Sequence, residues 1–314
     1  MNRILAAGAA LTIAAVGLVA CGDDDKSGGG ASTFSAPGAI DCGNMFSTMS
    51  AISTEGLVAL EDDKVMVPNE AVLPLLRRDL ATVEVLDVLN GVSAALTTPT
   101  LKAMMVEVEV DKKAPDVVAT AFVATLSAPA AADKPLEFAL GSADFPESQL
   151  LAEIYGQALE LAGHKVNRNL AIGSRELYYK ALVNAEIDIL PEYTNSLLSF
   201  ALRQDNPDAR PAATNLDQQI AELAGALPES LVVGKPSSAE DKDVIVCSKV
   251  VADGYGLKTL SDLAKVSKDI RIGAPPEFET RAPFGLVGFK EIYGAEFKSF
   301  TPLGVGDIAA AING

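Results

Sequence analysis

The stretch LEFALGSADFPESQLLAEIYGQALELAGHKVNRNLAIGSRELYYKALVNAEIDILPEYTNS, residues 136–196, contains the clearest run of alternating strand and helix signals. A short apolar strand ends at Gly141, and a helix with apolar residues at helical spacing runs from about Pro146 to Gly163. A second strand and helix follow, and a third strand is predicted to stop at Pro191. This β-α-β-α-β order predicts a parallel sheet, with ligands at the carboxyl ends of its strands. The loops at those ends are Ser142–Glu147, Gly173–Glu176 and Pro191–Ser196.

Several spaced motifs in this stretch and beyond it resemble one known family. They are GSADFPES, EIYGQALELAG, GSRELYYKAL, EIDILPEYT and, further on, GAPPEFETRAPFGLVGFKEIYG. In this order they resemble the substrate-binding proteins of osmoprotectant ABC importers, the glycine betaine/choline/carnitine family, from Leu136 to Gly314. The resemblance implies a type II periplasmic-binding-protein-like α/β fold. Such a fold has two lobes, each a mainly parallel sheet flanked by helices, with the ligand cleft between them.

Residues 39–126 resemble the carboxyl-terminal third of the same family rather than a separate domain. They contain an acidic turn at Asp62–Lys64 and the segment VDKKAPDVVA at Val110–Ala119. Placed after residue 314, they complete the family's order, because the final DIAAAING leads directly into AIDCGNMF. We therefore expect a circular permutation in which SAPAAADKP, Ser127–Pro135, joins the family's usual ends. The alternatives are a tail fragment fused ahead of a truncated second copy, and an artificially assembled chain.

The permuted order assigns residues 39–63 and 243–314 to lobe 2, and residues 64–242 to lobe 1. In lobe 1, residues 80–108 are helix-like, and helices are predicted at LLSFALRQ and DQQIAELAGAL. In lobe 2, strands are predicted at Asp241–Ala252, IRIGAPPEF and EFKSFTPL, with helices at KTLSDLAKV and from Pro283 onward.

The first residues have the pattern of a lipoprotein signal peptide. Arg3 is followed by an uncharged apolar run from Ile4 to Ala20, which ends in small residues before Cys21. We expect residues 1–20 to be removed, Cys21 to carry the lipid, and the Gly-, Ser- and Asp-rich residues 21–38 to be a flexible tether. The alternative is a transmembrane anchor. This pattern predicts a lipid-anchored protein on the extracytoplasmic face of the cell membrane.

Composition restricts the partners and the chemistry. The net charge of −17 argues against nucleic acid, whose phosphates need basic patches. His164, the single histidine, lies at a predicted helix end and is expected to be a solvated surface side chain. We find no Ser-His-Asp set, metal-ligand spacing or phosphate-binding glycine loop, so we expect neither an enzyme, a cofactor nor a metal. The expected partners are a small solute and the transmembrane subunits of an ABC permease, and the expected state is a monomer.

Cysteine usage predicts a disulfide. Beyond Cys21 the chain has two cysteines, Cys42 and Cys247, and an even pair in an oxidising compartment is a candidate bridge. The family resemblance implies that their strands lie close together in lobe 2. Two buried free thiols are the alternative.

The candidate ligand residues come from the resemblance. A quaternary ammonium group forms no ordinary hydrogen bonds, so proteins hold it with aromatic faces and nearby carboxylates. Tyr193 matches a cage tyrosine of the family, Phe46 stands where relatives have another, and Arg281 matches an arginine that grips a ligand carboxylate. Tyr193 and Arg281 have structural alternatives, which are a half-buried structural tyrosine and a surface ion pair with Glu277 or Glu279. The other predicted ligand-binding residues are Thr194, Ser196, Thr48, Asp243, Ser142 and Asp144.

The sequence also departs from the family's pattern. Asp243 stands where relatives often have a cage tyrosine, no ring lies near Ile308, and Ala143 replaces a commonly basic residue. Two rings make a poor cage, although Asp243 would place a negative charge beside a cation. The predicted function is delivery of a small quaternary-ammonium osmoprotectant to a permease. The alternatives are binding of a different small solute, and a sensor or scaffold lipoprotein that does not transport.

Overall fold

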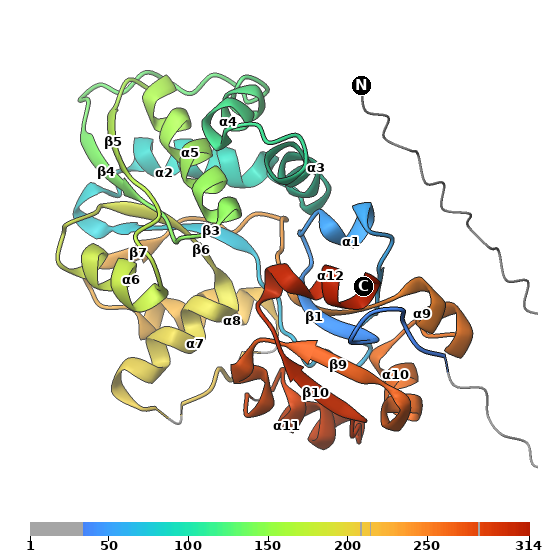
Figure 1. Ribbon diagram of the computed structural model, residues 1–314. Helices are drawn as coiled ribbons and strands as arrows, with labels where there is room; N and C mark the ends of the chain where they lie inside the picture. The colour runs from blue at the N-terminus through green and yellow to red at the C-terminus, as the bar shows by residue number, and fades with distance from the viewer. Residues whose placement is uncertain (1–33, 208, 214, 282) are drawn as a thin grey trace, which may run out of the picture. The chain divides into compact units, whose positions relative to one another are not determined.

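The computed structural model describes residues 34–207, 209–213, 215–281 and 283–314, and their strands form two separate five-stranded sheets (Figure 1). The strand order in the first is β5-β4-β6-β3-β7, and in the second it is β10-β9-β1-β8-β2. The first sheet comprises β3 (Val72–Arg77), β4 (Glu137–Gly141), β5 (Lys165–Asn169), β6 (Ile189–Tyr193) and β7 (Leu231–Val233). The second comprises β1 (Cys42–Phe46), β2 (Val58–Ala59), β8 (Asp243–Cys247), β9 (Arg271–Ala274) and β10 (Ser299–Pro302). The predicted two-lobe α/β class is confirmed, and we call the first-sheet body lobe 1 and the other lobe 2.

Both sheets are mixed. In lobe 1, β4 pairs in parallel with β5 and β6, whereas β3 pairs antiparallel with β6 and β7. In lobe 2, β9 pairs in parallel with β1 and β10, whereas β8 pairs antiparallel with β1 and β2. The strands β3 and β8, which follow the two connections between the lobes, run antiparallel to their neighbours. The other pairings in each sheet are parallel, as expected.

Helices cover both faces of the lobe 1 sheet, which the alternation along β3 makes clear. Val72 and Leu76 belong to one buried apolar cluster, together with residues of α2–α5, and Leu73 and Leu75 belong to another, with residues of α6–α8. The first group of helices is α2 (Val83–Ala95), α3 (Thr98–Glu109), α4 (Pro115–Val123) and α5 (Pro146–Leu161). The second group is α6 (Arg175–Val183), α7 (Thr194–Asp205) and α8 (Leu216–Ala226).

Lobe 2 has shorter helices and a single buried apolar cluster. Its helices are α1 (Ala51–Thr54), α9 (Lys249–Tyr255), α10 (Leu260–Val266), α11 (Leu286–Gly288) and α12 (Ile308–Asn313), and a π-helix spans Phe289–Tyr293. Short 3-10 helices occur at Arg78–Leu80 in lobe 1 and at Ser267–Asp269, Pro276–Glu279 and Val305–Asp307 in lobe 2. Cys42 and Cys247, which face each other across the β1–β8 ladder, form a disulfide.

The start and the end of the described chain meet in lobe 2. The Gly38 N–H donates to the Ile312 carbonyl at 3.1 Å, and the Ile40 N–H donates to the Ala311 carbonyl at 3.2 Å. The end of α12 therefore lies beside the residues that lead into β1, the central strand of the lobe 2 sheet, and the labels β1 and α12 are neighbours in Figure 1. Gly43 allows α12 to pack closely, because a Cβ there would lie 2.4 Å from Ile308 Cγ2.

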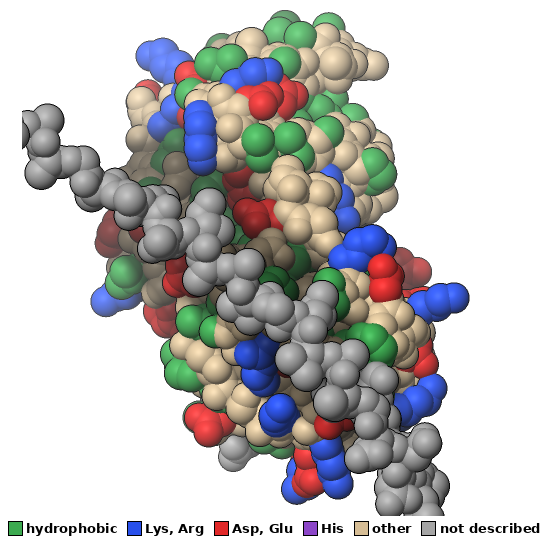
Figure 2. All heavy atoms as spheres, turned by 45° about the vertical axis from the view of Figure 1, so that its right-hand side comes forward, with side chains coloured by type: hydrophobic (Ala, Val, Ile, Leu, Met, Phe, Trp, Pro, Cys, Tyr) green, Lys and Arg blue, Asp and Glu red, His purple; other side chains and the backbone are tan. Residues whose placement is uncertain are grey.

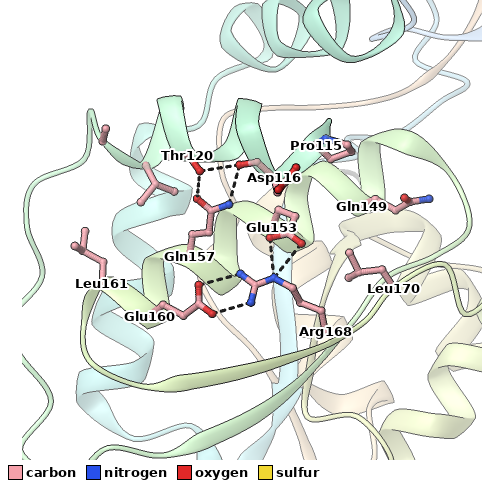
Figure 3. A pocket seen from close by; sticks show the side chains of 12 residues that line it. Pro115, Asp116, Thr120, Gln149, Glu153, Gln157, Glu160, Leu161, Arg168 and Leu170 are labelled. Carbon is pink, nitrogen blue, oxygen red and sulfur yellow. Dashed lines mark hydrogen bonds and ion pairs between the residues drawn. The ribbon is translucent and has the colours of Figure 1, made fainter. Parts of the chain in front are cut away.

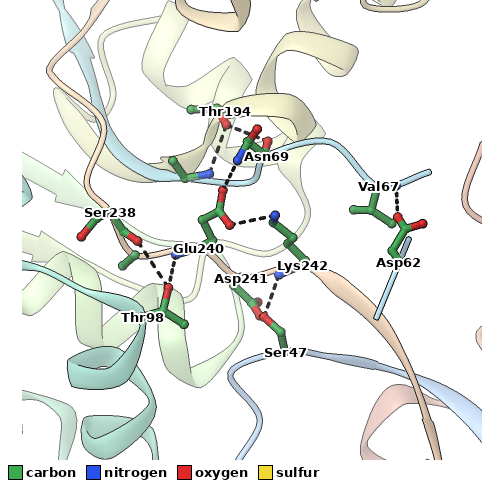
Figure 4. A network of polar contacts seen from close by, with 12 residues as sticks. Ser47, Asp62, Val67, Asn69, Thr98, Thr194, Ser238, Glu240, Asp241 and Lys242 are labelled. Carbon is green, nitrogen blue, oxygen red and sulfur yellow. Dashed lines mark hydrogen bonds and ion pairs between the residues drawn. The ribbon is translucent and has the colours of Figure 1, made fainter. Parts of the chain in front are cut away.

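Two segments connect the lobes, one before β3 and one before β8, and they are hydrogen-bonded to each other. The Asp241 N–H donates to the Glu70 carbonyl at 3.2 Å, and the Asn69 amide donates to Glu240 Oε1 at 2.5 Å. Lys242 forms an ion pair with Glu240 at 2.8 Å, and its backbone N–H donates to Ser47 Oγ of lobe 2 (Figure 4). These contacts hold the two crossing segments to each other and to Ser47 of lobe 2.

Four sequence-based boundaries were wrong. The strand β6 does not stop at Pro191, which lies opposite Pro74 of β3, but continues to Tyr193. The Pro74 carbonyl accepts from Gly234 of the β7 side, so this proline pair needs no N–H between β3 and β6. The strand predicted to reach Ala252 ends at Cys247, because Ser248 caps α9 by accepting from the Val251 N–H at 3.2 Å.

The helix-like stretch 80–108 is also two helices, α2 and α3, because Thr97 caps the second and Pro99 occupies its first turn. Similarly, the helix predicted after Pro283 is the short α11 followed by the π-helix.

Two predicted surface features are packed instead. His164 is 6 % exposed, accepts from the Leu136 N–H at Nδ1 and contacts Phe138 edge to face, so it is not a solvated imidazole. Burial lowers the pKa of His164. Phe34, placed by sequence in the flexible tether, packs against Tyr255 of lobe 2 with ring centroids 5.1 Å apart. The predicted signal peptide and Cys21 lie outside the described residues.

Candidate functional site

A cavity of about 690 Å³ lies between the two lobes, with residues of both in its wall. In Figure 2, acidic side chains are visible in the hollowed middle of the molecule. The lobe 2 wall comprises Phe46, Thr48, Met49, Asp243, Arg281, Val305 and Gly306. The remaining wall comprises Met105, Glu109, Ala143, Asp144, Phe145, Pro146, Glu147, Gly173, Ser174, Arg175, Tyr178, Tyr193, Ser196 and Asp241.

Most of the residues predicted from the sequence line this cavity. They come from separate elements: Tyr193 ends β6, Phe46 ends β1, and Asp243 begins β8. The predicted residues in the wall are Phe46, Thr48, Asp144, Tyr193, Ser196, Asp243 and Arg281. The strand ends thus gather these side chains at the facing edges of the two sheets.

Ser142 and Thr194, two of the predicted ligand-binding residues, do not line this cavity. Both are fully buried. The Ser142 hydroxyl donates to the Ala143 carbonyl at 3.0 Å and accepts from the Ala171 N–H at 2.8 Å. The Thr194 hydroxyl donates to the Asn69 carbonyl and accepts from the Ala71 N–H. These hydroxyls hold the loops in place beneath the cavity.

Ser196 reaches the wall, but its hydroxyl proton is already used. It donates to Glu70 Oε1 at 2.8 Å, while the Ser196 backbone N–H donates to Glu70 Oε2. Burial raises the pKa of Glu70 to about 7, although Ser196 partly offsets the rise. Ser196 therefore holds Glu70 behind the wall rather than offering a free donor to a solute.

Glu147 and Asp241 are two carboxylates of the wall whose pKa values are raised. Glu147 is 4 % exposed and accepts from the Tyr193 hydroxyl at 2.6 Å, and Asp241 accepts from the Thr48 N–H at 3.1 Å. Burial, together with repulsion from Asp241, raises the pKa of Glu147 to about 8. Burial also raises the pKa of Asp241 to about 6, although hydrogen bonds from Thr48 partly offset it.

Arg281 and Asp243, two predicted site residues, are paired with each other. The Arg281 guanidinium donates to Asp243 Oδ2 at 3.1 Å and to the Phe284 carbonyl at 2.6 Å. It also lies 5.7 Å from the centroid of the Phe284 ring. The expected alternative partners, Glu277 and Glu279, are not in this pair. Because Asp243 neutralises Arg281, the lobe 2 wall offers a weaker hold on a solute carboxylate than a free arginine would.

Arg175 is the other arginine in the wall, and it too is paired. Its guanidinium forms two hydrogen bonds with Glu192, at 2.9 and 3.0 Å, and the Tyr178 hydroxyl donates to the same carboxylate at 2.9 Å. Glu192 is fully buried, so this network is a rigid floor beneath the cavity.

The aromatic rings form an incomplete cage. Tyr193 and Phe145 stack on one another, with centroids 6.4 Å apart and planes at 27°. A cation is attracted by an aromatic ring only within about 6 Å of the ring centroid. Because these two rings contact each other, a methylated ammonium cannot lie between them. Phe46, 42 % exposed, offers a ring from lobe 2.

A model of one protein family matches residues 33–125 and 138–313, which is most of the chain. The family is described as the substrate binding domain of the ABC-type glycine betaine transport system. This chain belongs to that family. The resemblance identified from the spaced motifs is thereby confirmed, and with it the type II periplasmic-binding fold.

Two curated proteins to which this chain is similar have related names. The glycine betaine-binding protein YehZ of Escherichia coli strain K12 is 27% identical over 195 residues, 60% of this chain and 62% of that protein. The carnitine transport binding protein OpuCC of Listeria monocytogenes serotype 1/2a (strain 10403S) is 23% identical over 188 residues, 55% of this chain and 56% of that protein. The chain thus spans less than two thirds of the length of either relative.

Sequence reasoning missed several wall residues of this glycine betaine family member. Glu147 follows Pro146 in the first turn of α5, where a carboxylate normally faces water and favours the helix dipole. Asp241 stands in the second crossing segment, just before β8. Phe145 and Arg175 lie in two of the loops that were predicted to hold ligands. Their position in these loops was the sequence signal that could have identified them as wall residues.

A second cavity, of about 770 Å³, lies on lobe 1 between α4, α5 and β5 (Figure 3). Its arginine is already paired, because Arg168 forms ion pairs with Glu153 at 2.9 Å and Glu160 at 2.7 Å. Within the described part of the chain, no group of histidine, cysteine and acidic side chains is arranged to hold a metal ion. The cavity between the lobes is therefore the better candidate for a solute.

Proposed function

We propose that this protein is the extracytoplasmic solute-binding component of an ABC importer, holding a small solute with an alkylated ammonium group between its lobes. The solute is of the glycine betaine, choline or carnitine type, and the protein delivers it to the permease. The observation that carries this proposal is the cavity itself. Its wall combines the rings of Tyr193, Phe145 and Phe46 with the carboxylates of Glu147 and Asp241, and rings with nearby carboxylates attract alkylated ammonium ions.

The printed names of the relatives support the same class, since one is a glycine betaine-binding and the other a carnitine transport binding protein. Lipid anchoring at Cys21 remains part of the proposal and rests on the amino-terminal sequence pattern. Among the residues that the structure describes, no helix is both long and apolar enough to cross a bilayer.

We also propose that the chain order is a circular permutation of the family's order. The proximity of Gly38 to Ile312 supports it, as does the family match in two parts, which leaves out residues 126–137 and with them the predicted linker. A variant with Gly314 joined to Ala39 through a short linker, and with new ends inside 127–135, should fold and bind the same solute. Failure of that variant to fold would favour the fusion alternative.

Titration calorimetry against glycine betaine, choline, carnitine and proline betaine tests the binding function. At least one of them should bind to the full chain with a single site. Binding of none would overturn the osmoprotectant assignment. A protein that binds one of them and yet does not restore uptake when its permease is present would instead support the sensor or scaffold alternative.

A further inference from the structure

The carboxylates of Glu147 and Asp241 indicate a property of the solute that the proposed function leaves open. We propose that the cavity prefers an alkylated ammonium ion that keeps at least one N–H, as a protonated tertiary amine does, and that this N–H donates to the Glu147–Asp241 pair. The inference rests on the proposed function and refines which ammonium ion the same cavity holds.

Glu147 has one oxygen that a donor must satisfy. Its Oε1 accepts from the Tyr193 hydroxyl, but its Oε2 is buried and makes no hydrogen bond of ordinary geometry within the described residues. The Thr48 hydroxyl lies close enough to offset part of the rise in the pKa of Glu147, but it is an uncharged donor. A buried acceptor without a partner is costly, and nearly all such groups in folded proteins are satisfied. A quaternary ammonium would supply charge without a hydrogen bond. A protonated tertiary amine supplies both.

The cations of the wall do not neutralise this pair. Arg281 is bound to Asp243, and Arg175 is bound to Glu192. The Asp241 carboxylate accepts from the Thr48 N–H and, at 3.3 Å, from the Ser47 hydroxyl, both of which are uncharged donors. Two close carboxylates repel each other when both are ionised, and Glu147, whose pKa is raised to about 8, therefore keeps a proton at pH 7 in the solute-free protein. A cation from the solute takes the place of that proton and completes the pair.

The arrangement of the aromatic rings supports the same inference. Because Tyr193 and Phe145 stack on each other, they cannot surround three methyl groups from opposite sides. The Tyr193 hydroxyl is also committed to Glu147. With less cation–π attraction available, the carboxylates contribute more of the hold, and carboxylates favour a cation that can donate a hydrogen bond.

The test uses two matched solute pairs, which differ by one methyl group replaced by hydrogen: choline against N,N-dimethylethanolamine, and glycine betaine against N,N-dimethylglycine. Calorimetry on the full chain at pH 7 should show dimethylethanolamine binding at least about tenfold tighter than choline, equivalent to about 1.4 kcal/mol. Dimethylglycine should likewise exceed glycine betaine.

The outcomes separate this inference from the proposed function. Choline binding as tightly as dimethylethanolamine, or more tightly, would overturn the inference and leave the proposed function standing. Binding of none of the four solutes, nor of carnitine or proline betaine, would overturn both.

A variant and its matched control locate the effect. Glu147→Gln should reduce the preference for the N–H solute to less than about twofold, because a neutral amide accepts a weaker hydrogen bond and brings no charge. Glu153→Gln changes a similarly buried carboxylate on the same helix, in the Arg168 cluster of Figure 3, and should leave the preference unchanged. Full preference in Glu147→Gln would overturn the assignment to Glu147. Should that variant not fold, the solute pairs on the unmodified chain still decide.

Discussion

The two lobes have sheets of equal size but are held together differently. In lobe 1, helices of up to 16 residues cover both faces of the sheet and bury two apolar clusters. In lobe 2, α9 and α10 have seven residues each, and one apolar cluster is buried. Lobe 2 instead has two specific links to the segment 39–46: the Cys42–Cys247 disulfide and the buried pair of Asp41 with Arg271. The comparison indicates that cross-links replace helix packing where a strand arrives from a distant part of the chain.

The largest expected effect is loss of the disulfide. Cys42→Ala combined with Cys247→Ala should lower the free energy of unfolding by roughly 3–5 kcal/mol, because the bridge closes a loop with a sequence separation of 205. Urea unfolding checks this, with fluorescence of tyrosines in the two lobes. Reductant should shift the unmodified protein to the same midpoint and leave the double variant unchanged. An unchanged midpoint in the double variant would mean that apolar packing alone holds β1.

The buried ion pair should rank second. Asp41 is fully buried and accepts from the Ala36 N–H, the Arg271 N–H and the Arg271 guanidinium. Asp41→Ala should cost about 3 kcal/mol, because it leaves the guanidinium and two backbone donors without their acceptor. The exposed pair of Lys249 with Asp253 provides the control, since Asp253→Ala should change stability by less than about 0.5 kcal/mol. Equal effects of both substitutions would contradict the role given to Asp41.

The same carboxylate makes a pH prediction. Burial alone would raise the pKa of Asp41, but hydrogen bonds from Arg271 and Ala36 outweigh it and hold that pKa below its ordinary value. A lowered pKa contributes stability above the unfolded-state value, about 3.9, and that stability is lost as the pH falls through the folded-state value. Asp41→Ala should therefore flatten the acid limb of the stability curve below about pH 4.

The sequence was sufficient for the repeating features of the fold. Helical spacing placed α5, α6 and α8, Gly163 marked the end of α5, and the spaced motifs identified the family. The exact ends of some elements could not be predicted. Ser248 caps a helix inside what looked like one long strand, and Pro191 continues a strand because it lies opposite another proline. Neither outcome is visible without knowing which backbone groups face a neighbour.

For the site, the sequence could place residues at strand ends but could not say what each one contacts. Tyr193, Phe46 and Asp243 reach the cavity wall, as their positions after or at the ends of strands imply. Thr194 is adjacent to Tyr193 and yet turns inward to the Asn69 carbonyl. Glu147 looked like an ordinary first-turn carboxylate, because the groups that act on its charge, Asp241 and Thr48, are far away in the sequence.

On the lobe 1 side of the cavity, Glu147→Gln should raise the stability of the solute-free protein at pH 8. The folded-state pKa of Glu147 is raised, so its contribution to stability is full below the unfolded pKa of about 4.3 and is lost as the pH rises through about 8. Its facing groups are Asp241, Glu109 and the Tyr193 hydroxyl. The gain at pH 8 should be on the order of 1–3 kcal/mol and should vanish near pH 4. Thermal unfolding at both pH values measures it, and a gain of the same size at pH 4 would contradict the proton linkage.

On the lobe 2 side, Arg281→Ala should produce the smallest effect, and one whose sign depends on the solute. Removing Arg281 leaves Asp243 with the neutral Asn44 amide as its donor and no paired cation. Choline should then bind about two- to fivefold more tightly, because a partly exposed, solvent-screened charge contributes less than about 1 kcal/mol. Glycine betaine should bind about two- to fivefold more weakly, because its carboxylate then meets Asp243 without the guanidinium. Lys290→Ala, which breaks an exposed pair with Glu296 outside the cavity wall, is the matched control and should change neither affinity. Calorimetry with both solutes measures these changes. Equal losses of affinity for choline and glycine betaine would contradict the prediction and would mean that Arg281 holds the Phe284 loop in place rather than setting the charge of the wall.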